Sequence, residues 1–159
     1  MHALKIKDER KKTVHEESSL DENFIGKVTK YLEQLIAEKK ELYMLSLVDT
    51  KCQTIAEVFG ESAENRKELR DIRKHLCDIF TTFPVGLPRS IIIHHNELVV
   101  TLGKTPAGLG LVVIAPPADS LGMINMLVKR SSTEIDAIME REYFFLMRRR
   151  PPRAARGHL

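Results

Sequence analysis

One segment limits the folds open to this chain more than any other. Residues 109–115 read LGLVVIA, without a polar or charged side chain, and Pro116 and Pro117 follow at once. An apolar run of this length, ended by two prolines that cannot continue a ladder, is typical of a central β-strand buried on both faces. We therefore expect a sheet that is covered by helices on both sides.

The hydrophobic pattern predicts four more strands and three helices around this strand. Apolar residues recur at helical spacing in 24–40, in 62–83 and in a segment that begins near residue 120 and continues to Met139. Strand-like runs fall at 42–48, 53–59, 90–94, 98–103 and 109–115. The expected fold class is α+β, with a five-stranded antiparallel sheet and three helices in the order α-β-β-α-β-β-β-α.

Basic charge is concentrated at the C-terminus of the chain. The 159 residues include 25 Lys and Arg against 22 Asp and Glu, a formal net charge of +3. Residues 148–159 hold five arginines and no acid, whereas 1–23 and the middle of the chain are each slightly acidic. We expect a charged flexible arm at 1–23, a folded domain at 24–147 and an Arg/Pro-rich tail at 148–159. Since the excess lies in the tail, we expect no specific nucleic-acid partner.

Charges on the second predicted helix are sorted to opposite sides of its apolar stripe. One flank is acidic, with Glu64, Glu68, Asp71 and Asp78. The other flank is basic, and it includes Lys67 together with the residues that we select as candidate partner-binding residues: Arg66, Arg70, Arg73 and Lys74. Such a helix is either a docking surface or a solvated outer face with pairs at i,i+4 spacing.

No motif forms a self-contained active site. The GKT sequence at 103–105 resembles the end of a phosphate-binding loop, but position 98, where that loop requires glycine, is Leu98. His94 and His95 are adjacent in a strand, so their side chains point to opposite faces and are poorly placed to share a metal. We expect no catalytic residue, no metal and no cofactor.

The cysteines and the absence of targeting segments favour the reducing cytoplasm. Cys52 and Cys77 do not form a spacing typical of a disulfide framework. The N-terminus becomes charged at once, without the apolar run of a signal peptide. The longest uncharged stretch, 105–118, is too short to span a membrane.

An apolar cluster next to a basic run ends the third helix. Residues 143–147 read YFFLM, which is apolar on every side of a helix, and arginines follow directly. The cluster could bind an acidic partner groove or an anionic membrane surface, or it could complete the packing of the helix beside a solvated tail. The candidate partner-binding residues here are Phe144, Phe145, Arg148, Arg149 and Arg150.

Several segments resemble the Roadblock / dynein light-chain family, and within it the bacterial members that partner a Ras-like motility and polarity GTPase. They are LVDTKCQTIA at 47–56, LVVI at 111–114, SLGM at 120–123 and KRSSTEI at 129–135. The resemblance covers roughly residues 24–140 and keeps the element order of the family.

The resemblance implies a layered sandwich, related to profilin, with a sheet between one helix pair and a single helix. It implies a dimer in which the second helices pack together and edge strands join across the two-fold axis. It also implies a platform for a small GTPase, on which hydrolysis is stimulated by ordering the catalytic residues of the GTPase itself.

Two features depart from the family pattern. The family usually has a glycine in the first hairpin turn, where this chain has Cys52. The sorted charges of the second helix also bring like flanks together when two identical helices pair antiparallel. Either the charged flanks point outward in a homodimer and form a strip for an acidic partner, or the mate is a related Roadblock subunit. We expect the homodimer.

Our leading functional hypothesis is a cytoplasmic dimer that binds a Ras-like small GTPase and stimulates GTP hydrolysis. The alternative is a non-catalytic structural adaptor, a light-chain-like subunit of a larger complex. A third hypothesis is membrane or nucleic-acid contact through the arginine tail. A turnover assay separates the first two hypotheses, and deletion of 148–159 tests the third.

Overall fold

The computed structural model describes residues 22–117 and 121–148, and its elements follow one another in the expected order. The helices are α2 (Glu22–Glu38), α3 (Arg66–Thr82) and α4 (Leu121–Arg148). The strands are β1 (Met44–Val48), β2 (Thr54–Phe59), β3 (Ser90–His94), β4 (Val99–Lys104) and β5 (Gly110–Ala115). They form one antiparallel sheet in the order β2-β1-β5-β4-β3. The predicted fold class is confirmed.

Strand β5 lies at the centre of the sheet, between β1 and β4, and all of its residues are buried. Leu111 and Val113 belong to one hydrophobic cluster, and Val112 and Ile114 belong to another. Because successive side chains of a strand point to opposite faces, β5 contributes to both cores at once. The all-apolar sequence of this strand follows from that position.

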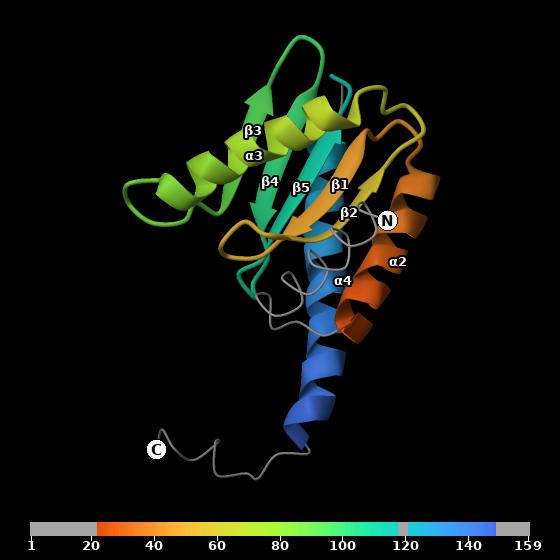
Figure 1. Cartoon of the computed structure of the whole chain (residues 1–159), viewed down its shortest axis with the longest axis vertical. Helices are drawn as coiled ribbons and strands as arrows, with labels where there is room; N and C mark the ends of the chain where they lie inside the picture. Colours follow the sequence, from red (N-terminus) through yellow and green to blue (C-terminus); the bar gives the residue numbers. More distant parts are fainter. Residues whose placement is uncertain (1–21, 118–120, 149–159) are drawn as a thin grey trace, which may run out of the picture.

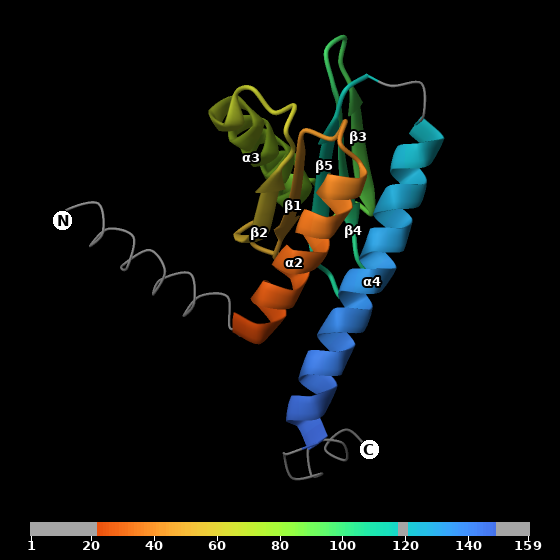
Figure 2. The same ribbon diagram turned by 90° about the vertical axis from the view of Figure 1, so that its right-hand side faces the viewer.

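The helices cover the two faces unequally. Figure 1 shows α3 lying alone across one face of the sheet, and Figure 2 shows α2 and α4 beside each other on the other face. Helix α2 contributes Phe24, Val28, Leu32 and Leu35, which are buried at spacings of three and four residues. This spacing puts the four side chains on one side of the helix, against the sheet.

The β1–β2 turn closes without a glycine. The Asp49 carboxylate accepts hydrogen bonds from the backbone N–H groups of Lys51 and Gln53, at 2.8 and 2.9 Å. Cys52 takes a positive φ of 64° and donates its N–H to the Asp49 carbonyl at 2.9 Å. A non-glycine residue in this left-handed region costs about 1–2 kcal/mol. The Asp49 bonds hold the turn that the family usually builds with glycine.

Helix α3 begins at Arg66, later than the hydrophobic pattern predicts from residue 62. Asn65 is its N-cap, and the Asn65 side-chain oxygen accepts a hydrogen bond from the N–H of Glu68 at 3.0 Å. An N-cap residue has extended backbone geometry, and the φ of −123° at Asn65 fits this role. The capping oxygen of Asn65 therefore fixes the start of the helix.

Helix α4 is longer than the sheet that it covers. Its 28 residues extend to about 42 Å at 1.5 Å per residue, whereas a six-residue strand extends to about 20 Å. Figure 2 shows its C-terminal half continuing past the sheet. No helix within 22–117 or 121–148 is long and apolar enough to cross a membrane.

The limits of the domain stay a prediction. The outer helices begin at Glu22 and end at Arg148, within two residues of the expected limits 24 and 147. Almost all of the predicted arm (1–23) and tail (148–159) lies outside the described residues.

Candidate functional site

The basic flank of α3 lies over β2, an edge strand of the sheet. Arg70 Nε donates a hydrogen bond to Glu57 Oε2 at 2.9 Å. Arg73 Nε approaches Glu57 Oε1 to 2.8 Å as an ion pair that is not aligned as a hydrogen bond. One carboxylate on β2 therefore holds two arginines from successive turns of the helix.

The ring of Phe59, on the same strand, contacts two arginines of the flank, Arg66 and Arg70. The guanidinium carbons of Arg66 and Arg70 lie 4.8 and 5.0 Å from the centroid of the Phe59 ring. A guanidinium over an aromatic face is attracted by the ring quadrupole. The Phe59 ring and the Glu57 carboxylate together fix the position of the basic flank, which would otherwise be three mobile side chains.

The four predicted residues of this flank differ in how much surface they offer. Arg66, Arg70 and Lys74 are exposed, whereas only 8% of Arg73 is accessible. The charge of Arg73 is therefore buried in its ion pair with Glu57 and is not available to a partner. Glu57 pairs with two arginines, and Arg66 and Lys74 have no carboxylate partner among the described residues, so the flank keeps an excess of positive charge at its surface.

The other side of α3 faces β3 and β4 and has an apolar surface bordered by the carboxylates of Glu68 and Glu97. A hollow of about 400 Å³ lies there, lined by Ile72, Ile79, Ile93 and Leu98 among others. Exposed apolar side chains continue this surface to the end of the helix, the following loop and β3: Ile79, Phe83, Val85, Leu87 and Ile93. Because β3 is also an edge strand, its outer backbone groups have no partner strand within the described sheet.

The two cysteines, which were not expected to form a disulfide, are bonded to each other. Cys52 in the β1–β2 turn and Cys77 on α3 form a disulfide with a Cα–Cα distance of 5.8 Å. The sequence-based expectation was wrong because the contact joins residues 25 positions apart, which only the tertiary structure brings together. The bond ties the single helix of this face to the hairpin beneath it.

Candidate residues near the C-terminus are only partly described. Phe144, Phe145 and Arg148 lie on α4, in the part that continues past the sheet, but their side chains are outside the description. Arg149 and Arg150 lie outside the described residues altogether. The helix does not bring Phe144, Phe145 or Arg148 to the basic flank of α3, because α4 covers the other face of the sheet.

The described residues supply no obvious chemistry of their own. Within 22–117 and 121–148 no three His, Cys, Asp or Glu side chains gather as a metal site. One group has a perturbed pKa: burial raises the pKa of Asp136 on α4, against the lowering effect of hydrogen bonds from the Ala107 N–H and the Thr105 side chain. Asp136 holds the β4–β5 turn against α4, away from the basic flank.

Among known proteins, the matches to this chain are solved structures with a similar fold. No protein-family model and no curated protein matches the chain. The structure of "MglB with tetrameric arrangement" matches with a TM-score of 0.65 and 13% identity, over 77% of this chain and 94% of that one. Gliding protein MglB from Thermus thermophilus gives 0.65 and 14% identity, over 77% and 95%. MglB from Myxococcus xanthus gives 0.59 and 17%, over 77% and 93%.

These matches confirm the expected resemblance at the level of the fold. Nearly the whole of each MglB chain is covered, so the likeness extends over the complete layered sandwich. At 13–17% identity the likeness is one of architecture. The roles of individual side chains must therefore be argued from this chain.

The structure also adds residues that the sequence did not single out. Glu57 and Phe59, which hold the arginines, lie on β2 and look like ordinary residues of a strand with one polar face. Their signal was weak but present: an acid in an otherwise apolar strand, TIAEVF, requires a buried cation or solvent beside it. The strand neighbours of a helix, however, follow only from the tertiary fold.

Proposed function

We propose that this chain is a Roadblock-fold regulator that dimerises, binds a Ras-like small GTPase and stimulates its GTP hydrolysis. The observation that carries the proposal is the basic flank of α3, fixed on β2, on a fold shared with MglB. Bacterial members of the Roadblock / dynein light-chain family, which this chain resembles, bind such a GTPase. The described part of this chain offers a surface for a partner and no catalytic group.

The apolar side of α3 is the proposed dimer surface. Ile79, Phe83 and Ile93 are exposed large side chains, from the end of α3 and an adjoining edge strand. Pairing of two copies through α3 and β3 would bury these side chains and satisfy the open edge of the sheet. The basic flank stays outside this interface, because it lies on the far side of α3, over β2. The acidic flank borders the interface through Glu68, and Glu97 lies beside it, so the pairing would have to leave these carboxylates at its solvated rim.

The basic flank is the proposed GTPase contact, with Arg66, Arg70 and Lys74 as direct contacts. A nucleotide-bound GTPase presents acidic and phosphate-rich surface, which arginines held in place would meet without losing much side-chain freedom. Arg73 is a positioning residue, because it is buried and acts through Glu57. Phe144, Phe145 and Arg148 on α4 remain proposed contacts, as do Arg149 and Arg150, which lie outside the described residues.

Stimulation of hydrolysis would then occur by ordering of the GTPase. Arg70 makes one hydrogen bond to Glu57 and stacks on Phe59, so it is poorly placed to leave its site and enter that of a partner. A rigid platform that fixes mobile loops of the GTPase increases its turnover without adding a group to the reaction.

The test is binding and turnover with a purified Ras-like small GTPase, for which a gene adjacent to that of this chain, where one is found, is the first choice. We expect Arg70→Glu combined with Lys74→Glu to weaken binding by tenfold or more and to remove the stimulation of phosphate release. Lys30→Glu on α2 is the matched control, since Lys30 is exposed on the other face of the sheet.

Three outcomes bear on the proposal. Unchanged affinity of the double variant would remove the basic flank from the GTPase contact. Tight binding with unaltered turnover would favour the structural adaptor instead. A monomer in light scattering at micromolar concentration, with GTPase binding intact, would contradict the dimer.

A further inference from the structure

A second hollow lies on the opposite face of the molecule from α3. It has a volume of about 710 Å³ and lies between the end of α2 and the first half of α4. Its apolar part consists of Leu127, which is buried, Met123, which is partly buried, and Met126, which is 73% exposed. We call this the α2–α4 hollow.

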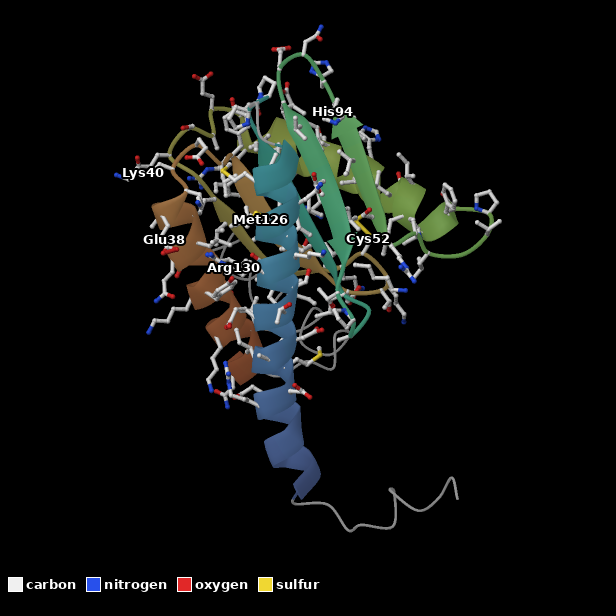
Figure 3. All side chains as sticks on the ribbon, turned by 180° about the vertical axis from the view of Figure 1, so that it is seen from behind. Glu38, Lys40, Cys52, His94, Met126 and Arg130 are labelled. Atoms are coloured by element: carbon white, nitrogen blue, oxygen red, sulfur yellow. A yellow bond between two sulfur atoms is a disulfide. The ribbon has the colours of Figure 1, made fainter. Side chains whose placement is uncertain are left out.

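The rim of the α2–α4 hollow is basic. Lys39, Lys129 and Arg130 line it, and none of the three has a carboxylate partner within the described parts of the chain. Figure 3 shows Met126 and Arg130 on the outward side of α4, with Glu38 and Lys40 at the neighbouring end of α2. Glu38 of α2 lines a separate, smaller hollow together with Arg130, and the two side chains do not form an ion pair.

The sequence of α4 has the same asymmetry. Its first part, 121–133, contains Lys129 and Arg130 and no acid, whereas acids begin at Glu134 and continue with Asp136, Glu140 and Glu142. The charge of the hollow is thus not neutralised from within its own helix.

We infer that the α2–α4 hollow binds an acidic amphipathic helix of a partner protein. Methionine side chains are flexible and polarisable, so Met123 and Met126 can adapt to the apolar face of such a helix. Carboxylates on the borders of that face would meet Lys39, Lys129 and Arg130. The apolar centre of the hollow and its basic border together favour a helix with an apolar face bordered by carboxylates.

A membrane surface fits this face less well. Met126 is the single exposed large apolar side chain on α2 or α4 among the residues whose side chains are described. Stable attachment to a bilayer needs a larger apolar area than one side chain provides. The surface is also hollowed, which suits an inserted side chain better than a flat layer of headgroups.

The position of the hollow makes this site independent of the proposed GTPase contact. The sheet separates it from the basic flank of α3. Both surfaces could therefore be occupied at once, and the chain would connect a GTPase on one face to an acidic partner on the other.

The experiment is a fluorescence anisotropy titration of the full chain with a labelled 16-residue peptide. The peptide carries leucine at helical positions i, i+3, i+4 and i+7 and glutamate at most others. A second peptide has the same composition with the leucines spread around the helix. We expect the first peptide to bind at least tenfold more tightly than the second, and less tightly as salt increases.

Two variants locate the binding. Arg130→Glu and Met126→Asp change exposed side chains and should each weaken binding of the first peptide by tenfold or more. Lys51→Glu in the β1–β2 turn carries a comparable charge reversal at an exposed position outside both proposed surfaces and should leave it unchanged. Thermal unfolding of each variant establishes that the chain is folded.

The remaining outcomes overturn the inference. Equal binding of both peptides would show simple attraction between opposite charges. Binding to vesicles of anionic lipid, lost in Met126→Asp, without peptide binding would assign the hollow to a membrane. No binding of either peptide, or binding that survives Arg130→Glu and Met126→Asp, would remove the site.

Discussion

The two faces of the sheet are stabilised in different ways. Two helices cover one face and bury the larger hydrophobic cluster, which includes Phe24, Leu32 and Ile135. A single helix covers the other face, over a smaller cluster around Phe80 and Leu76, and it is further held by a disulfide and by arginine contacts to β2. A lone helix leaves more of the sheet surface uncovered, which is where a dimer and a partner can attach.

The largest expected effect comes from removing a buried aromatic ring on either face. Phe24→Ala and Phe80→Ala each delete a side chain of 0% exposure, so each should lower the free energy of unfolding by about 3–5 kcal/mol. Phe80→Ala should also weaken GTPase binding where the variant is still folded, because it loosens α3. Urea unfolding and binding assays measure the two effects, and equal loss of binding in both variants would contradict the comparison.

The disulfide on the α3 face should contribute almost as much to the free energy of unfolding. Cys77→Ser, or reduction of the native chain, should cost about 3 kcal/mol, because the bond closes a loop of 25 residues in sequence separation. Cys52→Gly loses the same bond but relieves the positive φ. Under reducing conditions it should therefore be more stable than the native chain by about 1 kcal/mol.

Thermal unfolding with and without reductant, together with a count of free thiols, tests this pair of variants. The prediction is contradicted if both thiols of the native chain react freely with an alkylating reagent and reductant does not change its stability. The bond would then contribute nothing to the free energy of unfolding.

Each face carries an ion pair, and the two should differ in strength. Glu57→Gln leaves the guanidinium of Arg73 buried without its counter-charge, which should cost about 2 kcal/mol. Lys27→Met removes the pair with Glu142 on the other face, where Lys27 is 59% exposed, and should cost about 0.5 kcal/mol. Urea unfolding of both variants checks the difference, and equal costs would show that burial of Arg73 is unimportant.

The smallest expected effect is a pH dependence at Asp136. Burial raises the pKa of Asp136 above 3.8, so the folded chain holds this proton more tightly than the unfolded chain does. Its contribution to stability is complete below pH 3.8 and is lost as pH rises through the raised pKa. Asp136→Asn should remove that part of the pH slope in unfolding experiments, and an unchanged slope would assign it to other groups.

The sequence predicted the elements well because their signals are local. The buried strand 109–115, the hairpin and the stripe of α2 each follow from patterns within a few residues, and β5 and α2 lie where the patterns place them. The start of α3 was missed by four positions because apolar periodicity does not reveal the Asn65 cap.

The candidate site could be predicted only in part, because its decisive contacts join distant segments. The sorting of charge on α3 was visible, and it gave Arg66, Arg70 and Lys74 as exposed cations. The burial of Arg73 depends on Glu57, which lies on another element, and the Cys52–Cys77 bond depends on how α3 crosses the hairpin. Helix periodicity ranks positions around one helix and carries no information on which strand lies below it.

The tie between Cys52 and Cys77 also makes the chain its own proximity sensor. In the reduced chain, the two thiols can meet only while α3 rests on the β1–β2 turn, so the rate at which an added oxidant re-forms the bond measures how much of the time the helix is docked. Comparing this rate in the free chain and in a complex would report, without any attached label, whether a partner tightens or releases α3.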